Sequence, residues 1–350
     1  GMLSSIRAGI AEWLKNNREE DGIFLTPLDY PLLHAALLKN LKREGESKPD
    51  RILIPCYMGK KGHPIRIPGP LLEEILSCDE QGGLSRILSR HEEAYIYFET
   101  EDESVVLDMD TREDYREILS LRADQSGKEQ EESVPWEGFT GRLFFVRHGE
   151  TRRHEGKILL GQTDVPLSGK GRQEAQNAGE QLEKQDLHRP VLFTSDLSRA
   201  VETATIIREV LEKNRSVEIP LFQETAFREM DLADWDGKLI EEIIGQFPEE
   251  YERRGKDLLR YKRGPTGENF YDLRYRTWKR LRQIFREMKE KGEMNRDVIL
   301  IAHQGVIKVS LCTLYGQPLS RIREMQIPHG GVVEADLQRA SYHKKTGELS

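Results

Sequence analysis

The stretch that most constrains the fold of this chain is residues 143–149, Leu-Phe-Phe-Val-Arg-His-Gly. Four apolar residues, aromatic or branched, predict a short buried strand, and Arg147, His148 and Gly149 follow at its carboxyl end. In open α/β sheets, ligands bind beyond the carboxyl ends of the strands, and glycine lets the backbone turn sharply or approach a ligand. The stretch therefore predicts an α/β sheet with a ligand site at this edge.

Two further apolar runs end in the same kinds of side chain. Residues 298–302 lead to His303, and residues 191–193 lead through a short polar turn to Arg199. If the three strands are neighbours in the sheet, two histidines and two arginines meet in one pocket. Such a pocket suits phosphate, because guanidinium offers a planar, bidentate fork to its oxygens.

The residues at these strand ends resemble the histidine phosphatase superfamily, also called phosphoglycerate-mutase-like. Three blocks occur in the family's order: Arg-His-Gly-Glu-Thr at 147–151, Ser-Asp-Leu-Ser-Arg-Ala at 195–200 and Ala-His-Gln-Gly at 302–305. The resemblance covers about residues 141–338. It implies a phosphoglycerate-mutase-like domain, for which we expect a mixed, mostly parallel sheet with helices on both faces.

The resemblance also implies roles for individual residues. His148 is the expected nucleophile, which holds the phosphoryl group as phosphohistidine, and its neutral form is favoured by two nearby guanidinium groups. Arg147, Arg199 and His303 are expected to bind the phosphate and to stabilise the charge that develops on it. Glu229 is the expected general acid, and a surface salt bridge is its alternative role. This chemistry requires no metal or other cofactor.

Four other positions near these blocks are of interest. Thr151 and Gln162 are secondary candidates for binding the substrate or forming the pocket wall, and ordinary loop residues are the alternative. His154 stands where many family members have Asn, and Gln304 stands where Gly is usual. Gln304 adds bulk and an amide near the expected pocket floor.

Blocks at 161–168, 227–237 and 266–269 resemble α-ribazole phosphatase and its broad-specificity relatives, with Asn269 in place of the usual Ser. The expected activity is hydrolysis of a small phosphorylated metabolite, α-ribazole phosphate or another cofactor or nucleotide fragment. Phosphoglycerate mutase is the enzymatic alternative. A non-catalytic phosphate-binding or scaffold protein is the alternative of another class.

The first third of the chain alternates predicted strands and helices, which indicates an α/β unit. It resembles the later part of the nucleotidyltransferases that attach CMP or GMP to molybdenum cofactor. The matching residues are Ser-Ser-Ile-Arg-Ala-Gly at 4–9, Asp-Tyr-Pro at 29–31, Gly-His-Pro at 62–64 and a block at 108–114.

In that family, a strand and a glycine-rich, arginine-bearing loop come first and hold the nucleotide phosphates. No equivalent loop is found here, so we expect a truncated nucleotidyltransferase-like unit, with active nucleotidyl transfer as the less favoured alternative. Asp29 matches a metal-binding turn of that family and is a candidate ligand for a divalent ion; a solvated turn residue is the other interpretation. A truncated sheet leaves an exposed edge, through which the first domain could form an oligomer.

A length of 350 residues indicates two domains. We predict a truncated nucleotidyltransferase-like domain at 3–121, a charged linker at 122–138 and a histidine phosphatase domain at 139–350. The linker is low in apolar residues until Val134. Trp136 is expected to anchor its end on the second domain.

The composition of the chain indicates which binding partners and which cellular compartment to expect. A net charge of −8 argues against a general nucleic-acid binder, and no apolar run approaches the length of a membrane span. Three cysteines, far apart and without paired spacing, favour a reducing cytosol. We therefore expect a cytoplasmic protein whose partner is a small phosphorylated metabolite.

Local patterns also predict the remaining elements. In the first domain we expect a helix with Ile6, Ile10 and Trp13 on one face, a loop over 57–68 and a strand near 104–107. In the second domain we expect a helix capped near Ser168, a final strand at 331–335, and further helices at 197–213, 238–246, 268–291 and 304–315.

Overall fold

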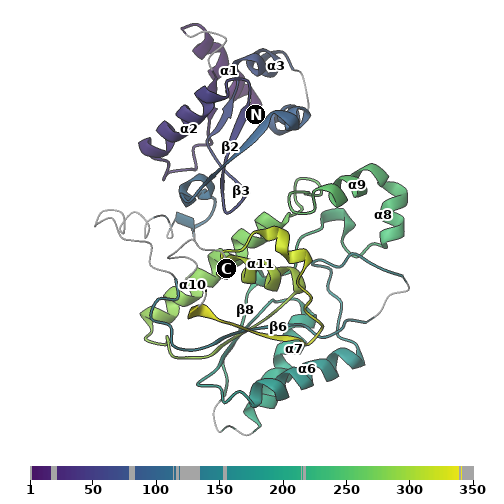
Figure 1. Cartoon of the computed structure of the whole chain (residues 1–350). Helices are drawn as coiled ribbons and strands as arrows, with labels where there is room; N and C mark the ends of the chain where they lie inside the picture. The colour runs from purple at the N-terminus through teal and green to yellow at the C-terminus, as the bar shows by residue number, and fades with distance from the viewer. Residues whose placement is uncertain are drawn as a thin grey trace. The chain divides into compact units, whose positions relative to one another are not determined.

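The chain is known from a computed structural model, which describes residues 2–16, 22–78, 83–112, 114–115, 118, 135–152, 156–213, 215, 218–338 and 340. It forms two compact units, residues 1–131 and 132–350 (Figure 1). Each unit has its own sheet. No helix in the described part of the chain is both long and apolar enough to cross a membrane.

The first unit is an α/β unit built on a mixed sheet. Its strands are β1 (Ile23–Leu25), β2 (Ile52–Tyr57), β3 (Lys60–Lys61), β4 (Ile65–Ile67) and β5 (Tyr95–Thr100). The strand β2 pairs in parallel with β5 and antiparallel with β3 and β4, and β4 pairs antiparallel with β1. The helices are α1 (Met2–Leu14), α2 (Ala35–Ser47), α3 (Leu72–Ser77) and α4 (Gly83–Leu88).

The apolar face predicted for the first helix is confirmed. Ile10 of α1 is buried in a core that contains Ile52 and Ile67 from the sheet, and Ile6 and Trp13 pack against the same core. This packing, repeated every three to four residues, is what holds an amphipathic helix on a sheet.

Two predictions in the first unit are wrong. Residues 103–106 form a 3₁₀ helix and not a strand, because the Asp102 carboxylate accepts the Ser104 N–H (3.0 Å) and turns the chain. The segment expected to be a loop over 57–68 contains β3 and β4. These strands are too short for their alternation to be visible in the sequence.

The second unit contains a five-stranded sheet whose order is β10-β6-β9-β7-β8. The strands are β6 (Leu143–Arg147), β7 (Val191–Thr194), β8 (Leu221–Gln223), β9 (Val298–Ala302) and β10 (Val332–Ala335). All pairings are parallel except that of β10 with β6. The predicted mixed, mostly parallel sheet is therefore confirmed.

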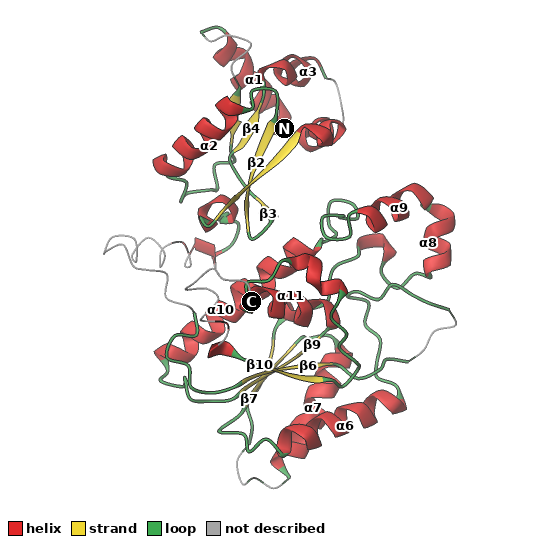
Figure 2. Ribbon diagram, in the orientation of Figure 1, coloured by secondary structure: helices red, strands yellow, loops and turns green. Residues whose placement is uncertain are grey.

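Helices cover both faces of this sheet. Figure 2 shows α6 (Gly169–Glu183) and α7 (Ser198–Glu212) on one face, and α10 (Phe270–Glu290) and α11 (Gln304–Leu314) on the other. Phe144 and Val146, alternate residues of β6, belong to the core shared with α6 and α7. The remaining helices are α8 (Ile240–Gln246) and α9 (Pro248–Lys256). The sequence did not predict α9, because it is polar and has no buried residue to mark its period.

Side-chain caps begin two of the helices that frame the sheet. The Ser168 hydroxyl accepts the Gly171 N–H (3.0 Å) at the start of α6, as predicted. Asn269 begins α10 with a capping box, in which its side chain accepts the Asp272 N–H and the Asp272 carboxylate accepts the Asn269 N–H. Asn and Ser are both strong cap residues, so Asn269 keeps the capping role that a Ser would have.

Trp136 anchors the chain at the start of the second unit, as predicted. Its side chain is 3% exposed and packs edge-on against Trp278, with the ring centroids 5.9 Å apart. Its indole N–H donates to the Leu337 carbonyl (3.2 Å). The contact thus joins the segment before β6 to α10 and to the segment after β10. Residues 122–134 of the predicted linker lie outside the described residues.

We expect Trp136→Ala to lower the free energy of unfolding of the second unit by about 3–5 kcal/mol, because it empties a buried aromatic site. Trp136→Phe is the matched control, which keeps an aromatic ring and removes the N–H donor. It should cost about 1 kcal/mol. Urea unfolding followed by circular dichroism measures both values. Equal stability of the Ala variant and the wild type would contradict the anchoring role.

Candidate active site

The register of three parallel strands brings the predicted site residues to one edge of the sheet. Arg147 of β6 lies opposite Ala302 of β9, and Thr194 of β7 lies opposite Ile301. The next residues along these strands include His148 and His303, whose ring centroids are 5.0 Å apart. The two histidines are thus neighbours although 155 positions separate them in the sequence.

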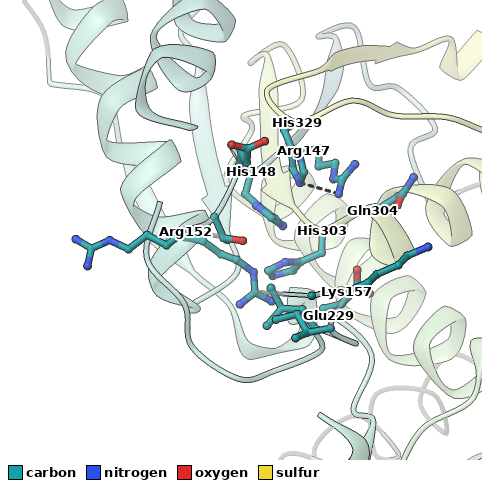
Figure 3. A pocket seen from close by; sticks show the side chains of 14 residues that line it. Arg147, His148, Arg152, Lys157, Glu229, His303, Gln304 and His329 are labelled. Carbon is teal, nitrogen blue, oxygen red and sulfur yellow. Dashed lines mark hydrogen bonds between the residues drawn. The ribbon is translucent and has the colours of Figure 1, made fainter. Parts of the chain in front are cut away.

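A cavity of about 580 Å³ opens at this edge (Figure 3). Arg147, His148, Arg199, Glu229 and His303 all line it. Among the secondary candidates, Thr151 lines the cavity and Gln162 is not among its described lining residues. The other residues of the wall are Glu150, Arg152, Gly156, Lys157, Ile158, Leu160, Gln304 and His329. His154 lies outside the described residues.

His148 is held with one ring nitrogen available to a ligand. Its Nδ1 lies 2.8 Å from the Gly149 carbonyl oxygen, which only accepts, so Nδ1 carries the proton and Nε2 keeps its lone pair. Burial, followed by the charge of Arg199, holds the pKa of His148 well below 6.5. A side chain at Gly149 would meet the Gly171 carbonyl oxygen at 2.2 Å, so this turn needs glycine.

Arg147 is tied to the segment before β10. Its Nη1 donates to the Ile327 carbonyl (2.7 Å) and its Nη2 donates to Nε2 of His329 (2.8 Å), drawn as a dashed line in Figure 3. Because Arg has only donors, His329 must accept here and carries its own proton on Nδ1. The buried Nε of Arg147 has no hydrogen-bond partner among the described residues.

The loop at residues 161–163, in the segment that follows β6, orients Arg199. Its Nη1 donates to the Thr163 carbonyl (2.9 Å) and its Nη2 to the Gly161 carbonyl (2.5 Å). The loop is itself held by Asp236, whose carboxylate accepts the N–H groups of Gly161, Gln162 and Thr163 at 2.6–2.8 Å. The Trp-Asp-Gly turn therefore positions the arginine indirectly.

His303 begins α11 and is 1% exposed. Its Nε2 lies 2.9 Å from the Ser195 hydroxyl oxygen, and its buried Nδ1 has no partner among the described residues. Burial, and then the neighbouring His148, holds the pKa of His303 well below 6.5. A neutral imidazole therefore lies beside the candidate nucleophile.

Glu229 lies on the wall formed by the start of α11. One carboxylate oxygen accepts the Met230 N–H (2.9 Å) and the other accepts the Gly305 N–H (3.0 Å). The Gly305 N–H is one of the first N–H groups of α11, which lack partners within the helix, so this bond fixes the Glu229 carboxyl group against the cavity.

The backbone of Glu229 is held from the other side. Its carbonyl accepts from Arg276 (3.0 Å) and from the side-chain amide of Gln162 (3.2 Å). Arg276 also pairs through two nitrogens with the carboxylate of Glu268. Gln162 and Glu268, both in blocks singled out in the sequence, thus support the wall of the cavity.

The sequence analysis missed His329. The antiparallel strand β10 begins opposite Val146, so the residues just before β10 lie beside the end of β6. The ring of His329 is 5.6 Å from that of His148. A histidine before the last strand was the available signal, and it carries information only once β10 is known to pair with β6.

Similarity to known proteins identifies the family of this chain. The family model of the histidine phosphatase superfamily (branch 1) matches residues 143–346, more than half of the chain. The chain belongs to this superfamily. The resemblance predicted from the three sequence blocks is thereby confirmed.

Curated relatives match parts of the chain. It is 40% identical over 109 residues to phosphoglycerate mutase 1 of Saccharomyces cerevisiae, which is 31% of this chain and 43% of that protein. It is 32% identical over 181 residues to glucosyl-3-phosphoglycerate phosphatase of Mycolicibacterium vanbaalenii, which is 51% of this chain and 76% of that protein. The chain spans less than half the length of the first curated relatives that it matches.

Two solved structures of phosphatases are similar to part of this chain. A mycobacterial glucosyl-3-phosphoglycerate phosphatase has 27% identity and a TM-score of 0.48, with 55% of this chain and 89% of that chain covered. An α-ribazole phosphatase from Shigella flexneri has 23% identity and a TM-score of 0.46, with 56% and 90% covered.

The first unit matches a different family model. Residues 1–94 match the MobA-like NTP transferase domain, which confirms the nucleotidyltransferase resemblance of this part. One carboxylate oxygen of Asp29 is buried without a partner among the described residues. The described residues hold no group of three or more His, Cys, Asp or Glu that could bind a metal ion. Metal binding by Asp29 stays a prediction.

The low pKa values of His148 and His303 predict that both stay neutral as the pH falls through 6.5. In phosphate-free protein with labelled histidine, NMR signals of these two rings should not move between pH 8 and pH 6. Variants His148→Gln and His303→Gln assign the signals. A titration midpoint at or above 6.5 for either ring would contradict the burial argument.

Proposed function

We propose that this protein is a phosphomonoester hydrolase that works through a phosphohistidine at Nε2 of His148. One observation carries the proposal: the Gly149 carbonyl accepts a hydrogen bond from Nδ1–H of a buried, neutral His148. This leaves the Nε2 lone pair in a cavity that Arg147 and Arg199 also line. A neutral imidazole between guanidinium groups is suited to attack phosphorus in line.

Each residue of the site has a separate role in the reaction. Nε2 attacks phosphorus while the bond to the leaving oxygen breaks, and Glu229 donates a proton to that oxygen. Arg147, Arg199 and His303 stabilise the charge on the remaining phosphoryl oxygens. Water then attacks the phosphohistidine and gives a proton to Glu229, which releases phosphate and restores the free imidazole. In this scheme positive charge comes from side chains, and we propose that no metal is required.

The proposed substrate is a small phosphorylated metabolite, with α-ribazole phosphate and other cofactor or nucleotide fragments as first candidates. The relative named glucosyl-3-phosphoglycerate phosphatase adds phosphorylated glycerates to the set to be tested. We also propose that the protein acts in the cytoplasm and does not bind nucleic acid, as its charge and cysteines indicate.

Phosphoglycerate mutase is the second candidate, because relatives with that name match the chain. A mutase returns the phosphoryl group to a second hydroxyl, whereas a hydrolase gives it to water. Formation of phosphate separates the two. A non-catalytic scaffold predicts no phosphohistidine, and an active nucleotidyltransferase predicts NTP binding that depends on Asp29 and a divalent ion.

The first test is hydrolysis of a phosphomonoester panel in EDTA by the wild type and by His148→Ala. The panel holds α-ribazole phosphate, 3-phosphoglycerate, nucleotides and an aryl phosphate. We expect activity that survives EDTA and falls roughly 10³-fold or more in the variant, as for other lost nucleophiles. Acid-labile labelling of wild-type protein by substrate, absent in His148→Ala, identifies the intermediate. Activity that needs a divalent ion or persists in the variant would contradict the proposal.

The role of Glu229 can be tested without changing it. A Cβ at residue 305 would lie 2.3 Å from the Glu229 carboxylate, so Gly305→Ala displaces this flexible group with little expected effect on stability. We expect kcat to fall about 100-fold for alkyl phosphates, and less for an aryl phosphate whose leaving group needs no proton.

Gly245→Ala is the matched control for this substitution. Gly245 is also helical, but nothing lies within 4 Å of an added Cβ, so this variant should keep wild-type activity. If Gly305→Ala hydrolysed alkyl phosphates at the wild-type rate, the position of Glu229 would not be required for catalysis.

A further inference from the structure

The Ser195 side chain contacts His303, which lines the cavity, and has no role in the reaction proposed above. Ser195 is fully buried, and its backbone N–H donates to the Ile301 carbonyl (3.1 Å) where β7 ends beside β9. Its hydroxyl oxygen accepts the Leu197 N–H (3.3 Å) and lies 2.9 Å from Nε2 of His303. The hydroxyl therefore sits between a backbone donor and an imidazole.

The donors and acceptors of the two side chains, together with their positions relative to the cavity, favour one direction for the second bond. A serine hydroxyl has one proton to donate and two lone pairs, and the Leu197 N–H already occupies one lone pair. Among the residues that the structure describes, no acceptor other than Nε2 of His303 lies within hydrogen-bond distance of this hydroxyl. A buried hydroxyl that donates to nothing is costly. The opposite direction would leave the Ser195 O–H, which does not line the cavity, without an acceptor. If the hydroxyl donates to Nε2, the unpaired donor is Nδ1–H of His303, in a ring that lines the cavity, where a ligand oxygen can accept it.

The position of the proton on the His303 ring follows from the same hydrogen bond. Its ring is buried and neutral at neutral pH, so it carries one proton. If Nε2 accepts from Ser195, that proton is on Nδ1. Nδ1 is buried, has no partner among the described residues, and belongs to a ring that lines the cavity beside His148 (Figure 3).

We propose that Ser195 is a positioning residue, whose hydroxyl holds the proton of His303 on Nδ1, where it faces the phosphoryl group. The opposite tautomer would present a lone pair to a phosphate oxygen and would repel it. An imidazolium would donate from both nitrogens and would not need Ser195 as a donor. The proposal deepens the phosphatase function proposed above and rests on it for its catalytic consequence, but not for the tautomer.

The proton can be located directly. Long-range ¹H–¹⁵N correlation spectra of histidine-labelled protein distinguish protonated from unprotonated ring nitrogens, and His303→Gln assigns the signals. In the wild type we expect the His303 proton on Nδ1, both free and with inorganic phosphate. In Ser195→Ala we expect that preference to be lost.

Kinetics supply the second readout. Ser195→Ala should lower kcat on the order of 100-fold, as for other lost donors to a developing charge. KM should change much less, because the contact matters most in the transition state. Ser195→Thr, which keeps a hydroxyl, should restore both the Nδ1 proton and most of kcat.

Ser310→Ala is the matched control. Ser310 is another buried serine, seven residues after His303, and its hydroxyl donates to the Val306 carbonyl within α11 (2.8 Å). Its loss removes a buried hydroxyl from the same helix without touching the His303 ring, so kcat and the tautomer should stay as in the wild type.

The outcomes separate the two proposals. A wild-type His303 with its proton on Nε2, or protonated on both nitrogens with phosphate bound, would overturn the inference whatever the activity. So would unchanged kcat in Ser195→Ala. An Nδ1 proton in a wild type that hydrolyses no phosphomonoester would support the tautomer and overturn the phosphatase. The wild-type spectrum needs no variant, so the inference is testable even if Ser195→Ala does not fold.

Discussion

The parallel pairing of β6 with β9 is the constraint on which the rest of the site depends. In this register the His148 N–H donates to the Ala302 carbonyl (2.9 Å), and His303 is the next residue. A shift by one residue would turn every side chain to the opposite face of the sheet and would separate the two imidazoles. The apolar core that Phe144 and Ile299 share with α6 and α7 holds the register. Packing far from the cavity thus fixes the distance between the rings.

The second organising feature is that neutral groups hold the two positively charged arginine side chains in position. Backbone carbonyls of Ile327, Thr163 and Gly161 hold the terminal nitrogens of the two arginines. Their Nε atoms and Nδ1 of His303 remain as buried nitrogens without partners among the described residues. Unsatisfied buried donors cost about 1–3 kcal/mol each. An anion with oxygens at these positions would offset that cost, so the unpaired nitrogens favour the binding of an anion.

Much of the fold was predictable because its signals are local. The run at 143–147 and the run at 298–302 were recognisable as buried strands, and Ser168 as a helix cap, from a few adjacent residues. The errors have the same origin. β3 and β4 have only two and three residues, too few for a pattern of alternation to be recognised. The helix α9 has no buried residue, and at 103–106 the capping carboxylate of Asp102 outweighs the strand propensity of Val105 and Val106.

The sequence by itself determined the chemical groups of the site and its family: His148, His303 and the two arginines occur in blocks whose order and strand context are readable without a structure. Only the tertiary structure decided how these groups are oriented. His329, Ser195 and Asp236 each meet their partner across 182, 108 and 73–75 residues of chain, respectively. No local pattern encodes such contacts. A hydrogen bond depends on where two backbones lie after packing, and that is set by the whole core.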